Sequence, residues 1–398
     1  MKRRTLLLTI VAACCLTGLA PGQTREIIGY YPSWKWRTDK NLLTPEKIPF
    51  WNLTTINYAF FFPLPDGTIV GRDSIGDAMI LQGSPGPARD HKGSRLTDLA
   101  HRNGVKVLLS IGGWEESGNF PLVAGDPARR ARFARACIER VVEFGFDGID
   151  IDWEYPGFSD HNGTPADRGN FTLLLQAVRD SLDRYGAENG RHLLLTAAIP
   201  TDPGRTSRDM DIARIAPILD FLNIMTYDFY GPWDPRSNHN SPLYAGEGGD
   251  STRCVDGAFT LFHTIYGVPP SKLTIGVPFY GHTYTHCTAL NTAHGGADTV
   301  HFPREGAFYW TIAQGMANFD RIWDDRAKVP YLVSASWNML VSYDDEESVR
   351  YKGEYAVEKG LNGIIIWEIS GDYMPDGRSP LLEVLSTTLR AAQSPRSH

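Results

Sequence analysis

Eight short, largely apolar runs, separated by amphipathic stretches, constrain the fold of this chain most strongly. The runs are apolar at successive positions, as expected for strands of a parallel sheet that is covered on both faces. Eight β/α alternations in one chain predict a TIM-type (β/α)8 barrel. The predicted strands are Ile27–Tyr31, Thr55–Phe61, Lys106–Ile111, Gly148–Ile151, Leu193–Ala198, Phe221–Met225, Leu273–Val277 and Gly363–Trp367.

Helical patterns fill most of the intervals between these runs. Asn170–Tyr185 carries apolar residues at helical spacing. Pro127–Phe144 follows Asp126, a favourable N-cap residue, and has proline at its first position.

The interval between the seventh and eighth strands is far longer than the roughly 30–40 residues of a βα unit. We therefore predict a small α+β insertion at 283–342, with a helix near Tyr309–Met316, on a barrel made of residues 25–282 and 343–392.

The two ends of the chain have their own signals. Residues 1–22 resemble an export signal, because Lys2-Arg3-Arg4 precedes an apolar run too short to span a bilayer. Cleavage after Ala20 would give a secreted protein, whereas acylation at Cys14 would give a cell-envelope lipoprotein. We expect one of these two destinations, no membrane span, a monomer, and a disordered tail at 393–398.

Charge and cysteine content exclude several classes of function. Lys plus Arg number 39 and Asp plus Glu 46, so the net charge is −7, and no basic cluster follows the first residues. Nucleic acid is therefore not an expected partner. Cys137 fits a buried thiol, while Cys254 and Cys287 could form a disulfide or remain separate. The Cys and His spacings do not suggest a metal site, and no cofactor is expected.

The most informative segment follows Asp147, on the fourth predicted strand. Side chains alternate along a strand, so its acidic and apolar residues face opposite sides. The acidic set is Asp150, Asp152 and Glu154, about 6.6 Å apart along the strand, and the apolar set is Ile149, Ile151 and Trp153. Like charges in an apolar interior raise at least one carboxyl pKa, which keeps a proton available near neutral pH. We predict that Glu154, at the carboxyl end of the strand, is a general acid.

Two other interpretations of the acidic set are weaker. A solvated loop or an ion-pair cluster would not require the alternating Ile and Trp. A divalent cation needs ligands that encircle it, which three carboxylates on one strand do not provide.

These residues resemble the family 18 glycoside hydrolases, the chitinases and their relatives. The resemblance runs from about Ile27 to Leu389. The predicted insertion at 283–342 is similar to a subdomain that deepens the substrate cleft in many relatives. One departure is His282, where many relatives carry Arg. The matching motifs are Asp147-x-x-Asp150-x-Asp152-x-Glu154, Ser110-Ile111-Gly112-Gly113-Trp114, Met225-Thr226-Tyr227-Asp228, Gly29–Trp34, Asn57–Phe60, Gly276–Gly281 and Trp367.

The resemblance implies a retaining, substrate-assisted hydrolysis, in which the 2-acetamido oxygen of the sugar attacks the anomeric carbon. Glu154 would protonate the glycosidic oxygen and later activate water. Asp152 would orient the acetamido N–H, Asp150 would share a proton with Asp152, and Tyr227 would hydrogen-bond the acetamido carbonyl. Asp147 would support the start of the strand. Close packing beneath the carboxylates would come from Ser110, Gly112 and Gly113.

This chemistry limits the substrate to chitin, chito-oligosaccharides or related N-acetylglucosamine glycans. The expected sugar contacts, with Trp367 as the floor, are Tyr30, Phe60, Trp114, Met225, Asp228, Tyr280, Trp367 and Trp233. Taken singly, each aromatic is equally compatible with the core. Two alternatives stay open: an endo-β-N-acetylglucosaminidase, against which the insertion argues, and a non-catalytic chitin-binding lectin, against which Glu154 argues.

Overall fold

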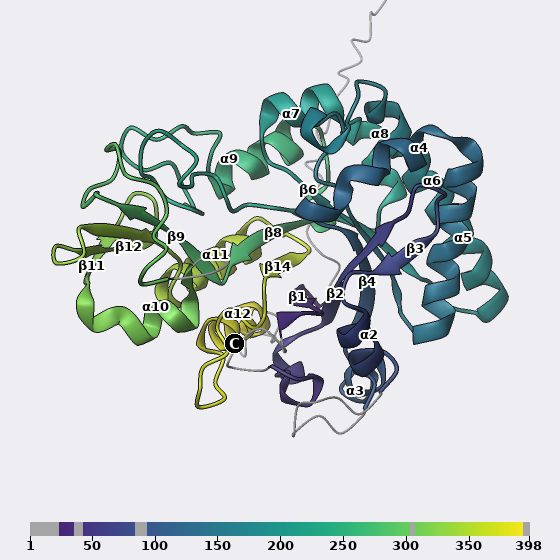
Figure 1. The fold of residues 1–398 in the computed structure, drawn as a ribbon, viewed down its shortest axis with the longest axis horizontal. Coiled ribbons are helices and arrows are strands. Elements are labelled where there is room, and N and C mark those ends of the chain that lie inside the picture. The colour runs from purple at the N-terminus through teal and green to yellow at the C-terminus, as the bar shows by residue number, and fades with distance from the viewer. Residues whose placement is uncertain (1–23, 36–42, 84–93, 303–306, 393–398) are drawn as a thin grey trace, which may run out of the picture.

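The computed structural model describes residues 24–35, 43–83, 94–302 and 307–392 (Figure 1). The predicted export segment with Cys14 and the predicted tail at 393–398 lie outside the described residues. Within the described ranges, no helix combines the length and the apolar character that a bilayer crossing requires.

Eight parallel strands close into a barrel, in the order β1-β14-β8-β7-β6-β5-β4-β2, with β2 pairing back onto β1. The predicted TIM-type barrel is confirmed, and each predicted strand lies within two residues of an observed one. The strands are β1 (Glu26–Pro32), β2 (Thr55–Pro63), β4 (Lys106–Gly112), β5 (Gly148–Asp152), β6 (Leu194–Ile199), β7 (Phe221–Ile224), β8 (Leu273–Pro278) and β14 (Gly363–Trp367).

Helices connect and cover these strands. The N-cap of α5 is the predicted one: Asp126 Oδ1 accepts the Arg129 N–H at 2.8 Å, and the helix ends before Gly145, which has φ 78°. The helices around the barrel are α2 (Ser74–Ile80), α3 (Leu96–Arg102), α4 (Phe120–Gly125), α5 (Pro127–Phe144), α6 (Asp167–Asn189), α7 (Pro203–Asp209), α8 (Ile212–Ile218), α9 (Val255–Phe259), α11 (Glu346–Glu358) and α12 (Pro380–Ala391).

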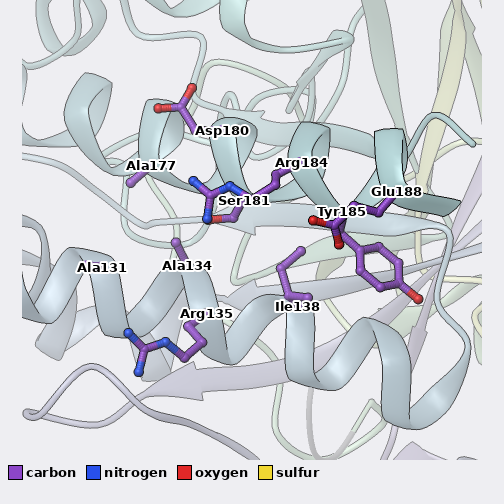
Figure 2. A pocket seen from close by; sticks show the side chains of 10 residues that line it. All are labelled: Ala131, Ala134, Arg135, Ile138, Ala177, Asp180, Ser181, Arg184, Tyr185 and Glu188. Carbon is purple, nitrogen blue, oxygen red and sulfur yellow. The ribbon is translucent and has the colours of Figure 1, made fainter.

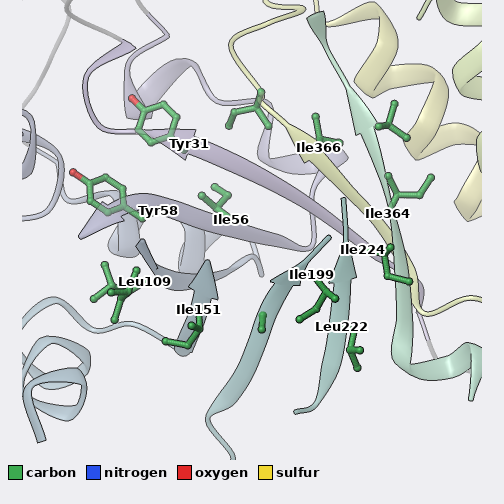
Figure 3. Packing of buried hydrophobic residues seen from close by; sticks show 14 of the residues in the cluster. Tyr31, Ile56, Tyr58, Leu109, Ile151, Ile199, Leu222, Ile224, Ile364 and Ile366 are labelled. Carbon is green, nitrogen blue, oxygen red and sulfur yellow. The ribbon is translucent and has the colours of Figure 1, made fainter. Parts of the chain in front are cut away.

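The two faces of the barrel strands bury different side chains. The outward faces form one large hydrophobic cluster with the helices, and Figure 3 shows Ile151, Ile199, Ile224 and Ile364 within it. The inward faces form a smaller cluster, and they also carry polar residues such as Asp150 and Asn223 that are fully buried. The barrel interior therefore contains a polar layer, which needs hydrogen-bond partners from within the barrel.

A second sheet lies between β8 and β14 in the chain and to one side of the barrel (Figure 1). Its order is β10-β9-β13-β12-β11, and the helix α10 (Tyr309–Gly315) follows β10. Because β9 begins two residues after β8 ends, this sheet is anchored at the carboxyl end of a barrel strand. Its strands are β9 (Tyr280–Thr285), β10 (Ala307–Phe308), β11 (Asp320–Asp324), β12 (Val329–Ser334) and β13 (Met339–Ser342).

One short strand has no counterpart in the sequence-based expectation. β3 (Ile69–Gly71) pairs antiparallel with the end of β2 and extends the barrel sheet at its carboxyl edge. Three residues are too few to show a periodic pattern, so the sequence does not predict this strand.

Candidate active site

A row of carboxylates leaves the carboxyl end of β5. Asp150 and Asp152 lie on the strand, and Glu154 lies in the turn that follows it. The alternating residues Ile149, Ile151 and Trp153 belong to the outer hydrophobic cluster, so the acidic side chains face the barrel interior.

Asp150 is the centre of the polar layer. Its Oδ2 accepts hydrogen bonds from Tyr30 Oη and Ser110 Oγ, each at 2.8 Å. Its Oδ1 accepts from Thr196 Oγ1 at 2.6 Å and from Asn223 Nδ2 at 3.0 Å. These donors come from four other strands, and together they use the four lone-pair positions of the carboxylate. Burial raises the pKa of Asp150, and the four donors oppose that shift.

The next two carboxyl groups favour their protonated forms. Burial, followed by the charges of Glu154 and Asp150, raises the pKa of Asp152 well above its ordinary value. Burial also raises the pKa of Glu154 to about 7, and the charge of Asp228 adds to this, while Tyr155 and the Arg205 guanidinium oppose it. Asp152 Oδ1 is buried and has no hydrogen-bond donor among the described residues. The row can therefore hold protons near neutral pH, and it offers a free acceptor.

The main chain of Glu154 is fixed from both sides. Its N–H donates to Ser117 Oγ at 2.8 Å, and His161 Nδ1 lies 2.6 Å from its carbonyl oxygen. Both partners lie in short 3-10 helices, Trp114–Asn119 and Ser159–His161, and sequence reasoning missed them because no motif spacing marks them. They hold the turn that carries Glu154 in one position relative to β5.

Tyr227 and Asp228 follow β7, in a segment held in place by β8 and by the irregular segment farther along the chain. Thr226 Oγ1 donates to the Gly276 carbonyl at 2.7 Å, and Ser241 Oγ donates to the Thr226 carbonyl at 2.6 Å. The Asp228 N–H donates to Asn240 Oδ1 at 2.8 Å. Burial, with the charges of Asp152 and Glu154, raises the pKa of Tyr227 well above its ordinary value, so this phenol keeps its proton.

Asp228 is contacted by two side chains of the second sheet. Its Oδ1 accepts from Tyr280 Oη at 2.6 Å and lies 2.8 Å from His282 Nε2. His282 also meets the ring of Trp233 edge-on, with 5.0 Å between ring centroids. His282, which the resemblance led us to expect to differ from many relatives, thus lies in direct contact with Asp228, a predicted site residue.

The predicted aromatic contacts fall into three groups. Trp367, Phe60 and Tyr30 form one cluster: the rings of Trp367 and Phe60 stack at 5.6 Å, and Trp367 lies 5.5 Å from Tyr30. Trp114 and Trp233 are instead exposed, at 52% and 62% of their surface. Tyr280 packs against Tyr227 with centroids 6.3 Å apart, and Met225 is buried.

Of the four predicted supporting residues, Ser110, Gly112 and Gly113 lie next to the carboxylate row, whereas Asp147 lies at the other end of β5. Ser110 donates to Asp150, as described above. A Cβ on Gly112 would lie 2.0 Å from the Asp152 carbonyl oxygen, and one on Gly113 would lie 2.5 Å from the Phe60 ring, so both positions need glycine. Asp147 lies at the amino end of β5, where its Oδ2 accepts the Val107 N–H at 2.8 Å, away from the other acids.

The cysteines and the surface groove contribute nothing to this site. Cys137, Cys254 and Cys287 are all free and buried, so the structure has no bond between Cys254 and Cys287. A groove of about 430 Å³ lies between α5 and α6 on the outside of the barrel, bordered by Arg135 and Arg184 (Figure 2). Within the described ranges, no three His, Cys, Asp or Glu side chains are grouped as metal ligands would be.

A family model, Glycosyl hydrolases family 18, matches residues 26–372, which include every strand of the barrel. The chain belongs to glycosyl hydrolases family 18.

Relatives with known names agree with this assignment to family 18. Chitinase A1 of Niallia circulans is 34% identical over 404 residues, which cover 87% of this chain and 56% of that protein. The chain therefore spans little more than half the length of this relative. The crystal structure of the Ostrinia furnacalis Group IV chitinase in complex with allosamidin has a TM-score of 0.81 and 30% identity, and covers 93% of this chain and 100% of its own. The structure of a family 18 N-acetylglucosaminidase from Paenibacillus barengoltzii has a TM-score of 0.75 and 30% identity. The match covers 92% of this chain and 100% of that structure's chain.

Proposed function

We propose that this chain hydrolyses β-1,4-linked N-acetylglucosamine polymers, namely chitin and chito-oligosaccharides, by a retaining, substrate-assisted mechanism. The observation that carries this proposal is the row of Asp150, Asp152 and Glu154 at the end of β5, with Glu154 at a pKa of about 7. A carboxyl group with such a pKa can donate a proton to a glycosidic oxygen and later accept one from water.

The sugar's own acetamido oxygen is the proposed nucleophile, as in the substrate-assisted exceptions to the two-carboxylate mechanism of glycosidases. Glu368, an acid that directly follows β14, is fully buried and accepts hydrogen bonds from the N–H and hydroxyl of Ser370. This side chain is therefore occupied within its own turn.

The other two carboxyl groups of the row, Tyr227 and the aromatic residues also have proposed roles. Asp150, whose oxygens face four donors, shares a proton with Asp152 and takes it up as the intermediate forms, which leaves Asp152 ionised. Asp152, with its unpaired Oδ1, receives the acetamido N–H and stabilises the cationic intermediate. Tyr227 donates its phenolic proton to the acetamido carbonyl, and Trp367 with Phe60 and Tyr30 supports the sugar ring.

Hydrolysis of a chromogenic chito-oligosaccharide, followed by product analysis on a longer oligomer, tests this function. We expect cleavage with retention at the anomeric carbon, and inhibition by allosamidin, the compound bound in the Ostrinia relative. Release of single N-acetylglucosamine units only would favour an N-acetylglucosaminidase, as in the Paenibacillus relative. Cleavage restricted to glycoprotein glycans would favour the endo-β-N-acetylglucosaminidase, and binding without hydrolysis the lectin. Export and a monomeric state stay predictions from the sequence.

The rate should fall on the alkaline side as Glu154 loses its proton. Because burial raises the pKa of this carboxyl to about 7, the acid is protonated below that pH and ionised above it. We expect kcat/KM for a chito-oligosaccharide to decrease tenfold per pH unit above about pH 7, since kcat/KM reports the free enzyme. An activity that stays constant to pH 9 would contradict this assignment.

Replacing Tyr227 by Phe should lower kcat more than it changes KM. The substitution removes the donor to the acetamido carbonyl but keeps the ring, so the attacking oxygen is less well oriented. We expect kcat to fall about 10- to 100-fold, with KM changed less than about threefold. The control is Tyr185→Phe on the outer helix α6, which should behave as the unmodified protein. A kcat for Tyr227→Phe equal to that of the control would remove Tyr227 from the mechanism.

A further inference from the structure

Arg205 lies over the aromatic rings that follow Glu154. It belongs to α7, which begins four residues after β6 ends, and β6 pairs with β5 in parallel. The segment with Arg205 and the segment with Glu154 therefore leave the same end of the barrel side by side. The guanidinium of Arg205 is 4.6 Å from the centre of the Tyr155 ring and 5.1 Å from that of Phe158. Both distances are within the range of a cation held on aromatic faces.

The start of α7 fixes the backbone from which this side chain extends. Asp202 is the N-cap residue, and its Oδ1 accepts the Arg205 N–H at 2.5 Å. Thr206 is fully buried, and its hydroxyl donates to the Asp202 carbonyl at 3.0 Å. With its backbone held here and its guanidinium held by the two rings, Arg205 loses little further freedom when a ligand binds to it.

The guanidinium of Arg205 has no polar partner in the part of the chain that the structure describes. No carboxylate there forms an ion pair with it, no oxygen accepts a hydrogen bond from it, and its Nη1 is buried without an acceptor. Arg208 on the same helix differs, because its Nε and Nη2 donate to Asp209 at 2.8 and 2.6 Å. A guanidinium carries five donors in one plane, so Arg205 can still donate to a bound molecule.

The surroundings of Arg205 place it beside the acid of the row. Tyr155 directly follows Glu154 in the chain, and the Arg205 guanidinium opposes the rise in the pKa of Glu154, as expected for a cation close to that carboxyl. Trp114 packs against the same two rings, with its centroid 6.2 Å from that of Tyr155 and 5.6 Å from that of Phe158. Arg205 and the exposed Trp114 thus border one aromatic group next to Glu154.

This aromatic group is separate from the floor that we propose for the reacting sugar. Trp367 and the two rings that it contacts form the floor, and no ring contact among the described residues joins them to Trp114. In the proposed reaction, Glu154 protonates the oxygen between the reacting sugar and the leaving sugar. A side chain that lies beside Glu154 but outside the floor therefore faces the leaving sugar.

We propose that Arg205 is a specificity-determining residue, which donates a hydrogen bond from its guanidinium to a hydroxyl or acetamido oxygen of the leaving sugar. This inference rests on the proposed function, because it takes Glu154 as the acid that separates the two sugars. The stacked rings fix the plane of the guanidinium, so the bond has a defined direction. A leaving group without such an oxygen gains nothing from Arg205.

The test compares kcat/KM for two substrates with different leaving groups, at pH 5.5, where Glu154 is protonated. One substrate is the tetrasaccharide of N-acetylglucosamine, and the other is its disaccharide joined to 4-chlorophenol, whose only oxygen is the glycosidic one. Arg205→Met keeps an apolar stem on the rings but removes the donors. We expect it to lower kcat/KM about 10- to 100-fold on the tetrasaccharide, as for the loss of a hydrogen bond to a charged group. On the aryl disaccharide we expect less than about a twofold change.

Two further variants separate this role from a structural one. Arg205→Lys keeps a charged donor without the planar fork, and should recover part of the loss on the tetrasaccharide. Arg208→Leu removes the neighbouring arginine, whose side chain is 68% exposed, and should leave both substrates unaffected. If Arg205→Met does not fold, Arg205→Leu carries the same test.

The ratio of the two kcat/KM values decides the outcome. Equal losses on the tetrasaccharide and the aryl disaccharide would show that Arg205 only supports the turn that carries Glu154, and would overturn the proposal. Unchanged values on both substrates would overturn it as well. Absence of hydrolysis of either substrate by the unmodified protein at every pH would instead contradict the proposed function.

Discussion

Glu154→Gln should lower kcat/KM on a chito-oligosaccharide by about 10³-fold, the middle of the range for removal of a general acid–base group. Glutamine keeps the shape of the side chain but cannot transfer a proton to the glycosidic oxygen. Binding of the oligosaccharide, measured by titration calorimetry, should change little, because the aromatic floor and Asp152 are untouched.

The thermal unfolding midpoint separates a chemical effect from a folding effect in this experiment. Removal of a buried carboxyl that resists ionisation should leave Glu154→Gln at least as stable as the unmodified protein at pH 8. The sign follows from the raised pKa: the native carboxyl favours the proton more than the unfolded one does, so its contribution to stability is lost as pH rises towards about 7. Glu139→Gln, on the exposed side of α5, is the control for activity. Hydrolysis by Glu154→Gln at a rate near that of Glu139→Gln would refute the proposed acid.

Lys352→Met should lower the free energy of unfolding by about 3–5 kcal/mol, because it leaves a buried carboxylate without its cation. Lys352 and Asp344 are almost fully buried, and Lys352 Nζ lies 2.7 Å from each oxygen of Asp344. Burial raises the pKa of Asp344 and lowers that of Lys352, and the attraction between the two groups opposes both shifts.

Denaturant unfolding measures this effect against two further variants. Arg350→Met breaks an exposed ion pair of the same helix, with Glu354, and should cost only about 0.3–0.5 kcal/mol. Lys352→Met combined with Asp344→Leu removes both charges and should recover a large part of the loss. A cost for Lys352→Met no greater than that for Arg350→Met would show that the pair does not stabilise the fold.

Lys352 also supports the site from a distance. Its Nζ donates to Ser241 Oγ at 2.7 Å, and Ser241 Oγ donates to the carbonyl of Thr226, the residue before Tyr227. We therefore expect Lys352→Met to lower kcat as well, even at a temperature where the variant is fully folded.

The barrel could be predicted from the sequence because its strands are continuous apolar runs, and their length and order are compatible with few other folds. The sequence also predicts which side chains of β5 face the barrel interior, since the alternation along a strand places Asp150 and Ile151 on opposite faces. The partners of Asp150 were different: Thr196 and Asn223 are single polar positions within apolar strands. Only the observed register, in which Asp150 lies opposite Thr196, shows that they meet.

Residues in loops and short 3-10 helices account for most of what the sequence could not predict in the site. Ser117, His161 and Asn240 act through hydrogen bonds to the main chain or from it. Such bonds depend on backbone geometry rather than on a spacing pattern, so no periodic signal identifies them. His282 stood out in the sequence as a departure from the family pattern, but its contact with Asp228 required the structure.

The first and last strands of the barrel pair side by side, and each provides part of the aromatic floor: β1 contributes Tyr30 and β14 contributes Trp367. A chain still emerging from the ribosome therefore lacks both the closed seam of the barrel and the contact between Tyr30 and Trp367. Closure of the barrel and completion of this aromatic cluster therefore depend on the same event, the docking of β14 beside β1.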